Sequence, residues 1–167
     1  MKFRSLTTGF ALAVVAVLGA SGPAAAGDLV PFHGRLVGDV TNPPLDPPVV
    51  FPHLSVLVEA TGQATRLGRF TLEFPHIVDL RDSSAIGTYT FTAANGDTLT
   101  ADVVGQGTPT GTPGVFYIVE VATITGGTGR FAGATGSFTV ERLSDRIAGT
   151  TVGSFEGTIS SRGAGKR

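Results

Sequence analysis

The stretch Ile124–Phe138, ITGGTGRFAGATGSF, decides the fold, because it places five glycines between two strand-like segments. Residues 127–132 match the G-x-G-x-x-G/A fingerprint of dinucleotide-binding proteins. That fingerprint holds a phosphate only where a helix begins and directs its amide groups at the ligand. Here the residues that follow predict another strand. We therefore interpret the stretch as a turn, with Arg130 outside and Phe131 in the core.

Apolar and polar residues alternate with a period of two in most segments of the chain after residue 26, as in 54–60 and 70–74. No such segment keeps a helical period for the ten or so residues that a helix needs, and threonine and glycine are abundant. The pattern predicts an all-β domain. About eight strands are expected, two of them in a hairpin near 88–103 and the others near 33–40, 53–60, 65–75, 115–124, 136–142 and 150–160.

The hairpin turn can be specified further. A two-residue Asn-Gly loop would place Phe91 opposite a threonine and join an apolar face to a polar one. A three-residue loop, Ala94–Gly96 with Gly96 left-handed, instead pairs Phe91 with Leu99 and Tyr89 with Ala101. We predict the three-residue loop.

Short strands in a protein without disulfides must protect their edges, and a closed sheet has none. We therefore predict a single antiparallel closed barrel, with a β-sandwich as the alternative. Glycines within strands permit the sharp coiling that closure needs. Six glycines fit that role: Gly34, Gly38, Gly133, Gly136, Gly153 and Gly157. Two connections are expected, a proline-rich crossing at 41–48 and a loose loop at 105–114.

The first 26 residues have the order of a secretory signal peptide: Lys2 and Arg4, an apolar run, then small residues up to Ala26. We predict cleavage after Ala26, a barrel domain over 27–161, a flexible basic tail over 162–167, and a secreted protein, extracellular or periplasmic. The apolar run is shorter than the roughly 20 residues of a membrane-spanning helix, so no stable membrane insertion is expected after cleavage. An uncleaved anchor is the alternative.

The charge balance argues against nucleic acid as a partner. The formal net charge is −1, and loss of Lys2 and Arg4 with the signal peptide makes it about −3. Because the remaining arginines are scattered, such a surface repels a phosphate backbone. The chain has no cysteine, which also excludes a catalytic thiol and a disulfide.

Residues Gly126–Gly136, GGTGRFAGATG, follow an apolar strand and precede a late one, and they resemble the GGTGxFxxAxG signature of dirigent and allene oxide cyclase-like barrels. The resemblance implies an eight-stranded antiparallel barrel with an apolar cavity. It also implies relatives that guide or perform cyclisation and coupling of hydrophobic molecules, often as trimers. A homo-oligomer, dimer or trimer, is expected on this basis. The catalytic acids of those relatives have no match here, so the activity is not implied with the fold.

Glu120 is the candidate catalytic residue. It lies in Val115–Ile124, a segment that is apolar on both faces and is expected to be buried throughout. Burial raises the pKa of a carboxyl group that has no partner, which suits general acid catalysis. The alternative is that Glu120 pairs with an arginine such as Arg130 or faces solvent at a strand end.

Three aromatic residues, Tyr89, Phe91 and Tyr117, are the candidate ligand-binding residues. A tyrosine hydroxyl inside a barrel can orient a ligand, and ordinary packing of core aromatics is the alternative. Three histidines, His33, His53 and His76, could bind zinc if they met at one rim. Their spacings match no local metal motif, so we predict no metal site and no cofactor.

Three functions remain for such a barrel. The first is binding of a hydrophobic small molecule in the lumen, because about eight strands enclose room for side chains or one small ligand. The second is a cyclase or isomerase that uses the same lumen and Glu120. The third is a structural or partner-binding surface protein whose lumen is filled by phenylalanines: Phe70, Phe74, Phe91, Phe138 and Phe155.

Overall fold

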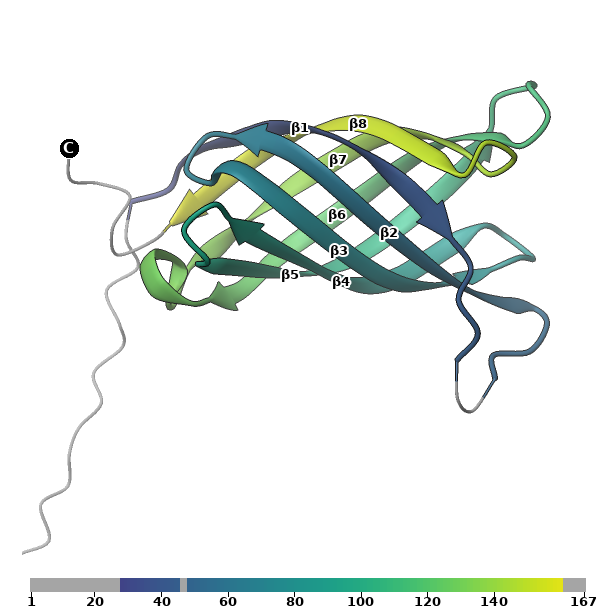
Figure 1. The fold of residues 1–167 in the computed structure, drawn as a ribbon, viewed down its shortest axis with the longest axis horizontal. Helices are drawn as coiled ribbons and strands as arrows, with labels where there is room; N and C mark the ends of the chain where they lie inside the picture. Colours follow the sequence, from purple (N-terminus) through teal and green to yellow (C-terminus); the bar gives the residue numbers. More distant parts are fainter. Residues whose placement is uncertain (1–27, 46–47, 161–167) are drawn as a thin grey trace, which may run out of the picture.

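The computed structural model describes residues 28–45 and 48–160, and its eight strands form a closed antiparallel barrel in chain order (Figure 1). The predicted barrel is confirmed, and the β-sandwich is excluded. The predicted signal peptide and the basic tail lie outside the described residues. The elements are β1 (Val30–Thr41), β2 (His53–Ala64), β3 (Gly68–Asp79), β4 (Ser84–Ala93), β5 (Thr98–Pro109), β6 (Val115–Gly127), η1 (Gly129–Phe131), β7 (Thr135–Asp145) and β8 (Thr150–Ser160).

The first and last strands close the barrel. β1 pairs with β8 from Val30↔Ile159 to Asp39↔Thr150. Glycines allow the strands to approach at the bends: a methyl group on Gly157 would lie 2.1 Å from the Ser137 carbonyl oxygen. Methyl groups would also collide with neighbouring strands at Gly34, Gly38, Gly136 and Gly153. Gly133 was wrongly included in this set, because it lies in a turn with open space around it.

The predicted hairpin is confirmed. Phe91 pairs with Leu99 and Tyr89 with Ala101 across β4 and β5, and Gly96 has a left-handed φ of 87°. The expected loose loop at 105–114 is partly wrong, because β5 continues to Pro109 and only the last five of these residues form the connection. The glycines that suggested a loop, Gly105 and Gly107, instead face the lumen as buried strand residues.

The glycine-rich stretch forms a turn, as predicted. Gly129–Phe131 is a single 3-10 turn, and β7 begins four residues later. The Phe131 side chain is buried, and the guanidinium of Arg130 donates a hydrogen bond to the Leu67 carbonyl oxygen at 3.0 Å. The described part of the chain contains no helix that is long and apolar enough to cross a membrane.

Aromatic rings fill one part of the lumen. The rings of Phe91, Phe138 and Phe155 lie with their centroids 5.3–5.9 Å apart, close enough for the edge and tilted contacts that stabilise aromatic clusters. Leu67 and Phe131 are also buried in this core, and both belong to connections at one end of the barrel. That end is called the closed end below. The cluster also includes Phe32, Phe70, Phe74 and Tyr89.

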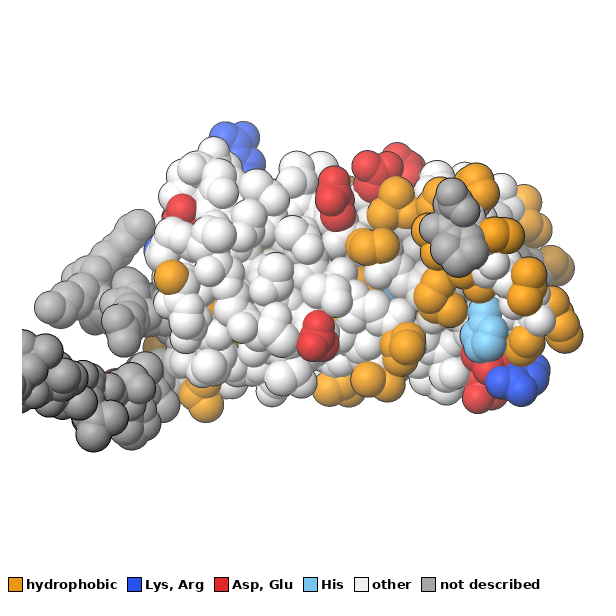
Figure 2. Space-filling view, turned by 90° about the horizontal axis from the view of Figure 1, so that it is seen from below, with side chains coloured by type: hydrophobic (Ala, Val, Ile, Leu, Met, Phe, Trp, Pro, Cys, Tyr) orange, Lys and Arg blue, Asp and Glu red, His pale blue; other side chains and the backbone are white. Residues whose placement is uncertain are grey.

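Exposed apolar side chains gather on the other half of the barrel, around the β1–β2 loop (Figure 2). Phe51 in this loop is 80% exposed. On the outer wall, Ile86, Val104 and Val121 lie side by side on β4, β5 and β6, and each is more than half exposed. These three residues are called the outer apolar row.

Candidate functional site

A buried polar cluster lies inside the otherwise apolar barrel. Glu120 on β6 is fully buried, and its Oε1 accepts a hydrogen bond from Nη2 of Arg142 on β7 at 2.6 Å. Oε2 accepts a second bond from Arg142 Nε at 2.9 Å and a third from the Tyr89 hydroxyl on β4. Arg142 Nη1 donates to the Thr151 hydroxyl on β8 at 3.3 Å. Four strands therefore hold one connected network.

The cluster is electrically matched. Burial, and then the negative charge of Glu120, raise the pKa of Tyr89 well above 10, so its hydroxyl remains a neutral donor. Burial alone would lower the pKa of Arg142, but its hydrogen bonds to Glu120 and the charge of that carboxylate raise it above the ordinary value. No buried side-chain nitrogen or oxygen among the described residues lacks a hydrogen-bond partner. Such pairing is what a buried charge needs.

Glu120 and Arg142 of this cluster form the floor of a cavity of about 60 Å³ that leads to the end of the barrel opposite Leu67 and Phe131. That end is called the mouth below. Lumen-facing glycines make room for the polar side chains: Gly105 lies directly across from Glu120, and Gly87 lies across from His76. The cavity is lined by Val40, Asn42, Val56, His76, Val78, Ser83, Ala85, Gln106, Gly107, Phe116, Ile118, Glu120, Arg142, Ser144 and Arg146.

The predicted site residues lie in different parts of the barrel: at the cavity, in the core and on the outer wall. Glu120 lines the cavity and pairs with an arginine, but the partner is Arg142 and not Arg130, which lies at the closed end. Tyr89 lies in the lumen beneath the pair, and Phe91 lies deeper in the aromatic core; neither lines the cavity. Tyr117 does not reach the lumen, because its side chain lies on the outer wall, 40% exposed.

The expectation that Val115–Ile124 is buried throughout is wrong. Its outward residues Val121 and Thr123 are exposed, whereas Glu120, Ala122 and Ile124 face the lumen. Glu120 and Tyr117 are three residues apart and therefore point to opposite faces of the strand. Both could not have faced the lumen.

Sequence reasoning missed Arg142 and Thr151, and it considered His76 only as a zinc ligand and not as a lumen residue near Glu120. A signal for two of them exists in the alternation. Arg142 is in phase with the lumen residues Phe138 and Val140, and His76 is in phase with Phe74. A polar residue at an apolar position of a strand marks an inward polar side chain.

The three histidines do not meet. His33 and His53 are exposed, whereas His76 is buried in the lumen. Among residues 28–45 and 48–160, no group of three or more histidine, aspartate or glutamate side chains is placed to hold a metal ion.

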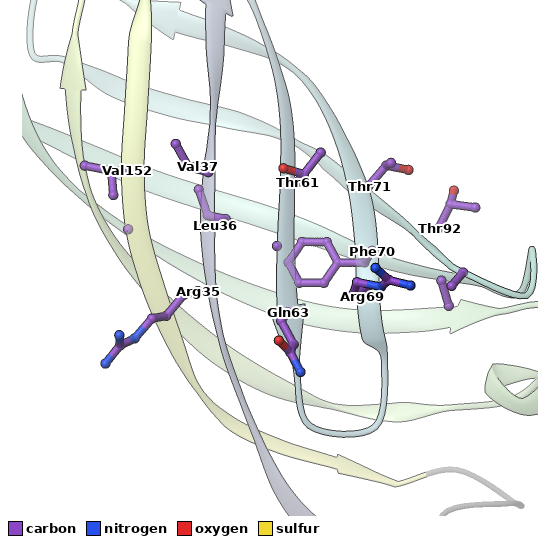
Figure 3. Close-up of a pocket in the computed structure, with 14 residues that line it drawn as sticks. Arg35, Leu36, Val37, Thr61, Gln63, Arg69, Phe70, Thr71, Thr92 and Val152 are labelled. Carbon is purple, nitrogen blue, oxygen red and sulfur yellow. The ribbon is translucent and has the colours of Figure 1, made fainter.

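A wider depression, of about 830 Å³, lies on the outer wall over β8, β1, β2, β3 and the end of β4 (Figure 3). Arg35, Gln63 and Arg69 extend from these strands without converging on a common point (Figure 3). The depression opens broadly to solvent, where charged side chains bind weakly. The smaller luminal cavity carries the buried charges, so it is the better candidate site.

The fold is that of the dirigent proteins. Two solved pterocarpan synthase dirigent proteins are similar to it: GePTS1, with a TM-score of 0.54 and 16% identity over 88% of this chain and 99% of its own, and PsPTS1, with a TM-score of 0.56 and 12% identity over 83% and 98%. No family model matches the sequence, and no curated protein matches it significantly.

Proposed function

We propose that this chain is an exported barrel protein that binds a small, largely hydrophobic molecule at the mouth, with a polar group of that molecule directed at Arg142. The observation that carries the proposal is the buried Glu120–Arg142 pair at the floor of a cavity that opens to one end. Export is supported by the signal-like order of the first 26 residues.

Energetics favour a role beyond stability. A buried ion pair seldom stabilises a fold more than apolar residues of the same size, because both charges lose their hydration. Arg142 has five N–H groups, and three of them are used in its bonds to Glu120 and Thr151. The remaining donors lie beside the cavity and are suited to a ligand oxygen.

The apolar part of the ligand is expected to lie near the mouth, not in the middle of the barrel. The aromatic core occupies the lumen towards the closed end. A lumen filled by phenylalanines is what the third functional alternative, a structural or partner-binding protein, would require. Phe116, Ile118, Val56 and Val78 line the cavity and supply apolar contact. A ligand larger than the cavity would extend between the mouth loops.

A catalytic form of the same site is the second candidate. The two similar structures are described as pterocarpan synthases, and a cyclase or isomerase would require a group that accepts or donates a proton at the cavity. Glu120 is the candidate, because its carboxylate lines the cavity and is held there by hydrogen bonds from the Tyr89 hydroxyl and the Arg142 guanidinium. Turnover that is lost in Glu120→Gln while binding is retained would distinguish this form from simple binding.

The binding proposal is tested by titrating the isotope-labelled chain from residue 27 with a fragment set of small aromatic alcohols, ketones and ethers, monitored by amide NMR. We expect shifts at Ile118, Ser144 and their neighbours, and none near Leu67 and Phe131 at the closed end. Shifts confined to the outer depression around Arg35 and Arg69, or no shifts at the solubility limit of the fragments, would refute the proposal.

A further inference from the structure

His76 is a polar group of the cavity that the Glu120 network does not use. It is 6% exposed, lies on the lumen side of β3, and stacks on Phe74 with ring centroids 4.1 Å apart. Its Nδ1 lies 3.0 Å from the Phe74 carbonyl oxygen. A carbonyl can only accept, so Nδ1 carries the proton and Nε2 presents a lone pair.

The Nε2 atom is available to a ligand. No residue in the described part of the chain makes a hydrogen bond to it. Every fully buried side-chain nitrogen in that part of the chain has a hydrogen-bond partner. Because Nε2 has none, it is not fully buried, and because His76 lines the cavity, Nε2 faces the cavity space. The lone pair is therefore an acceptor without a protein donor.

His76 remains neutral under ordinary conditions. The pKa of His76 is lowered to about 4, mainly by burial. The hydrogen bond to the Phe74 carbonyl and the negative charge of Glu120 oppose this shift, whereas the positive charges of Arg142 and Arg146 add to it. A neutral imidazole with so low a pKa is a weak base near pH 7, which favours recognition over proton abstraction. These three charged side chains come from β6, β7 and the connection after β7, and all of them line the cavity.

We infer that His76 is a specificity-determining residue, whose Nε2 accepts a hydrogen bond from a hydroxyl group of a neutral ligand while a second oxygen of that ligand accepts from Arg142. This inference rests on the proposed binding function. Other chemistries fit less well: Arg142 and Arg146 repel an ammonium group, and a carboxylate has no proton to donate to His76 Nε2. An ether of the same shape leaves Nε2 without a donor, which weakens binding.

The inference is tested with two neutral probes that differ in one donor, benzyl alcohol and benzyl methyl ether. Their dissociation constants are measured by NMR titration of the mature chain. We expect the alcohol to bind roughly tenfold more tightly than the ether, the scale of one buried hydrogen bond. The imidazole Nε2 resonance of His76 should shift with the alcohol and not with the ether.

Variants separate His76 from general effects. His76→Phe keeps the ring stack and removes the acceptor, so the preference for the alcohol should disappear. His76→Gln restores an acceptor and should restore part of that preference. His33→Phe makes the same change on the exposed outer wall and should leave the preference intact.

The outcomes are distinguishable. Equal affinity of the wild-type chain for both probes, or a preference that survives in His76→Phe, would overturn the role of His76 while leaving the binding site in place. Absence of binding by either probe would overturn the binding proposal and this inference with it. If His76→Phe fails to fold, the Nε2 resonance of the wild-type chain decides: an unchanged resonance with bound alcohol excludes the hydrogen bond.

Discussion

Gly105 lies directly across from Glu120 on the neighbouring strand, and a methyl group at position 105 would come within 2.8 Å of Glu120 Cγ. The missing side chain is what lets the carboxylate reach Tyr89 and Arg142. We expect Gly105→Ala to displace Glu120 and to lower the free energy of unfolding by about 1–3 kcal/mol. Gly107→Ala is the matched control, since its nearest neighbour would be a flexible Ile118 methyl at 3.2 Å. Urea unfolding checks both; equal effects would show that Glu120 is not confined by β5.

The Glu120–Arg142 pair predicts strong coupling between two substitutions. Glu120→Gln leaves a buried guanidinium without its counter-charge and should cost about 3–5 kcal/mol of the free energy of unfolding. Replacing both residues by leucine and methionine should recover most of that loss, because neither charge is then buried. A double-mutant cycle of Glu120→Leu, Arg142→Met and the variant with both changes, measured by urea unfolding, tests this. Additive single effects would contradict the coupling.

The low pKa of His76 predicts acid sensitivity. Its pKa is about 4 in the folded chain against 6.5 ordinarily, so the unfolded chain binds more protons between these values. The free energy of unfolding should therefore fall as pH falls from 6.5 to 4, by roughly 3 kcal/mol in total from this group. His76→Phe should lack that part of the loss. Asp79, whose pKa is lowered to about 2 by its hydrogen bonds to Arg81, contributes only below about pH 4 and so does not obscure the comparison.

Barrel closure depends on the glycine at position 157. A methyl group there would lie 2.1 Å from a backbone oxygen of β7, which cannot move without opening the β7–β8 pairing. We expect Gly157→Ala to lower the free energy of unfolding by about 3 kcal/mol or more. Gly133→Ala meets open space and strains only a left-handed φ of 71°, a cost of about 1 kcal/mol. Similar losses in thermal unfolding would contradict the closure argument.

The outer apolar row offers a test of the expected homo-oligomer. Ile86, Val104 and Val121 are 55–66% exposed and adjacent in the sheet, and contiguous apolar side chains of this kind can form a contact between protein chains. We expect the chain to self-associate through this row and Val104→Lys to shift the mass in light scattering to the monomer. The control is Asp102→Lys, a change two residues from Val104 on the same face of β5. A monomeric wild-type chain would reject the expectation.

Much of the fold could be predicted from sequence because strand alternation and turn chemistry are local. Phe91 and Leu99 had to share a face, and that requirement alone selected the loop at Gly96. The extent of β5 could not be predicted this way. Gly105 and Gly107 resemble loop residues, and only the volume of Glu120 on the next strand explains why glycine is needed at position 105.

The candidate site was only partly predictable for a related reason. Alternation assigns a residue to a face, but where both faces are apolar, as in Val115–Ile124, it does not say which face is inside. Glu120 was found, yet its partner lies on another strand. Glu120 pairs with Arg142 and not with Arg130 because of the barrel register. Ile118 lies opposite Arg142, and Glu120 lies two residues further along β6 on the same face.

The pairing of β1 with β8 also constrains how the chain reaches its final shape. The earliest strand has no partner on one side until the latest strand arrives, so the ring of hydrogen bonds is completed only after residues 150–160 are available. Until then β1 presents one edge of unpaired backbone groups. The ring of strands is therefore completed only when the last hairpin, formed by β7 and β8, is in place.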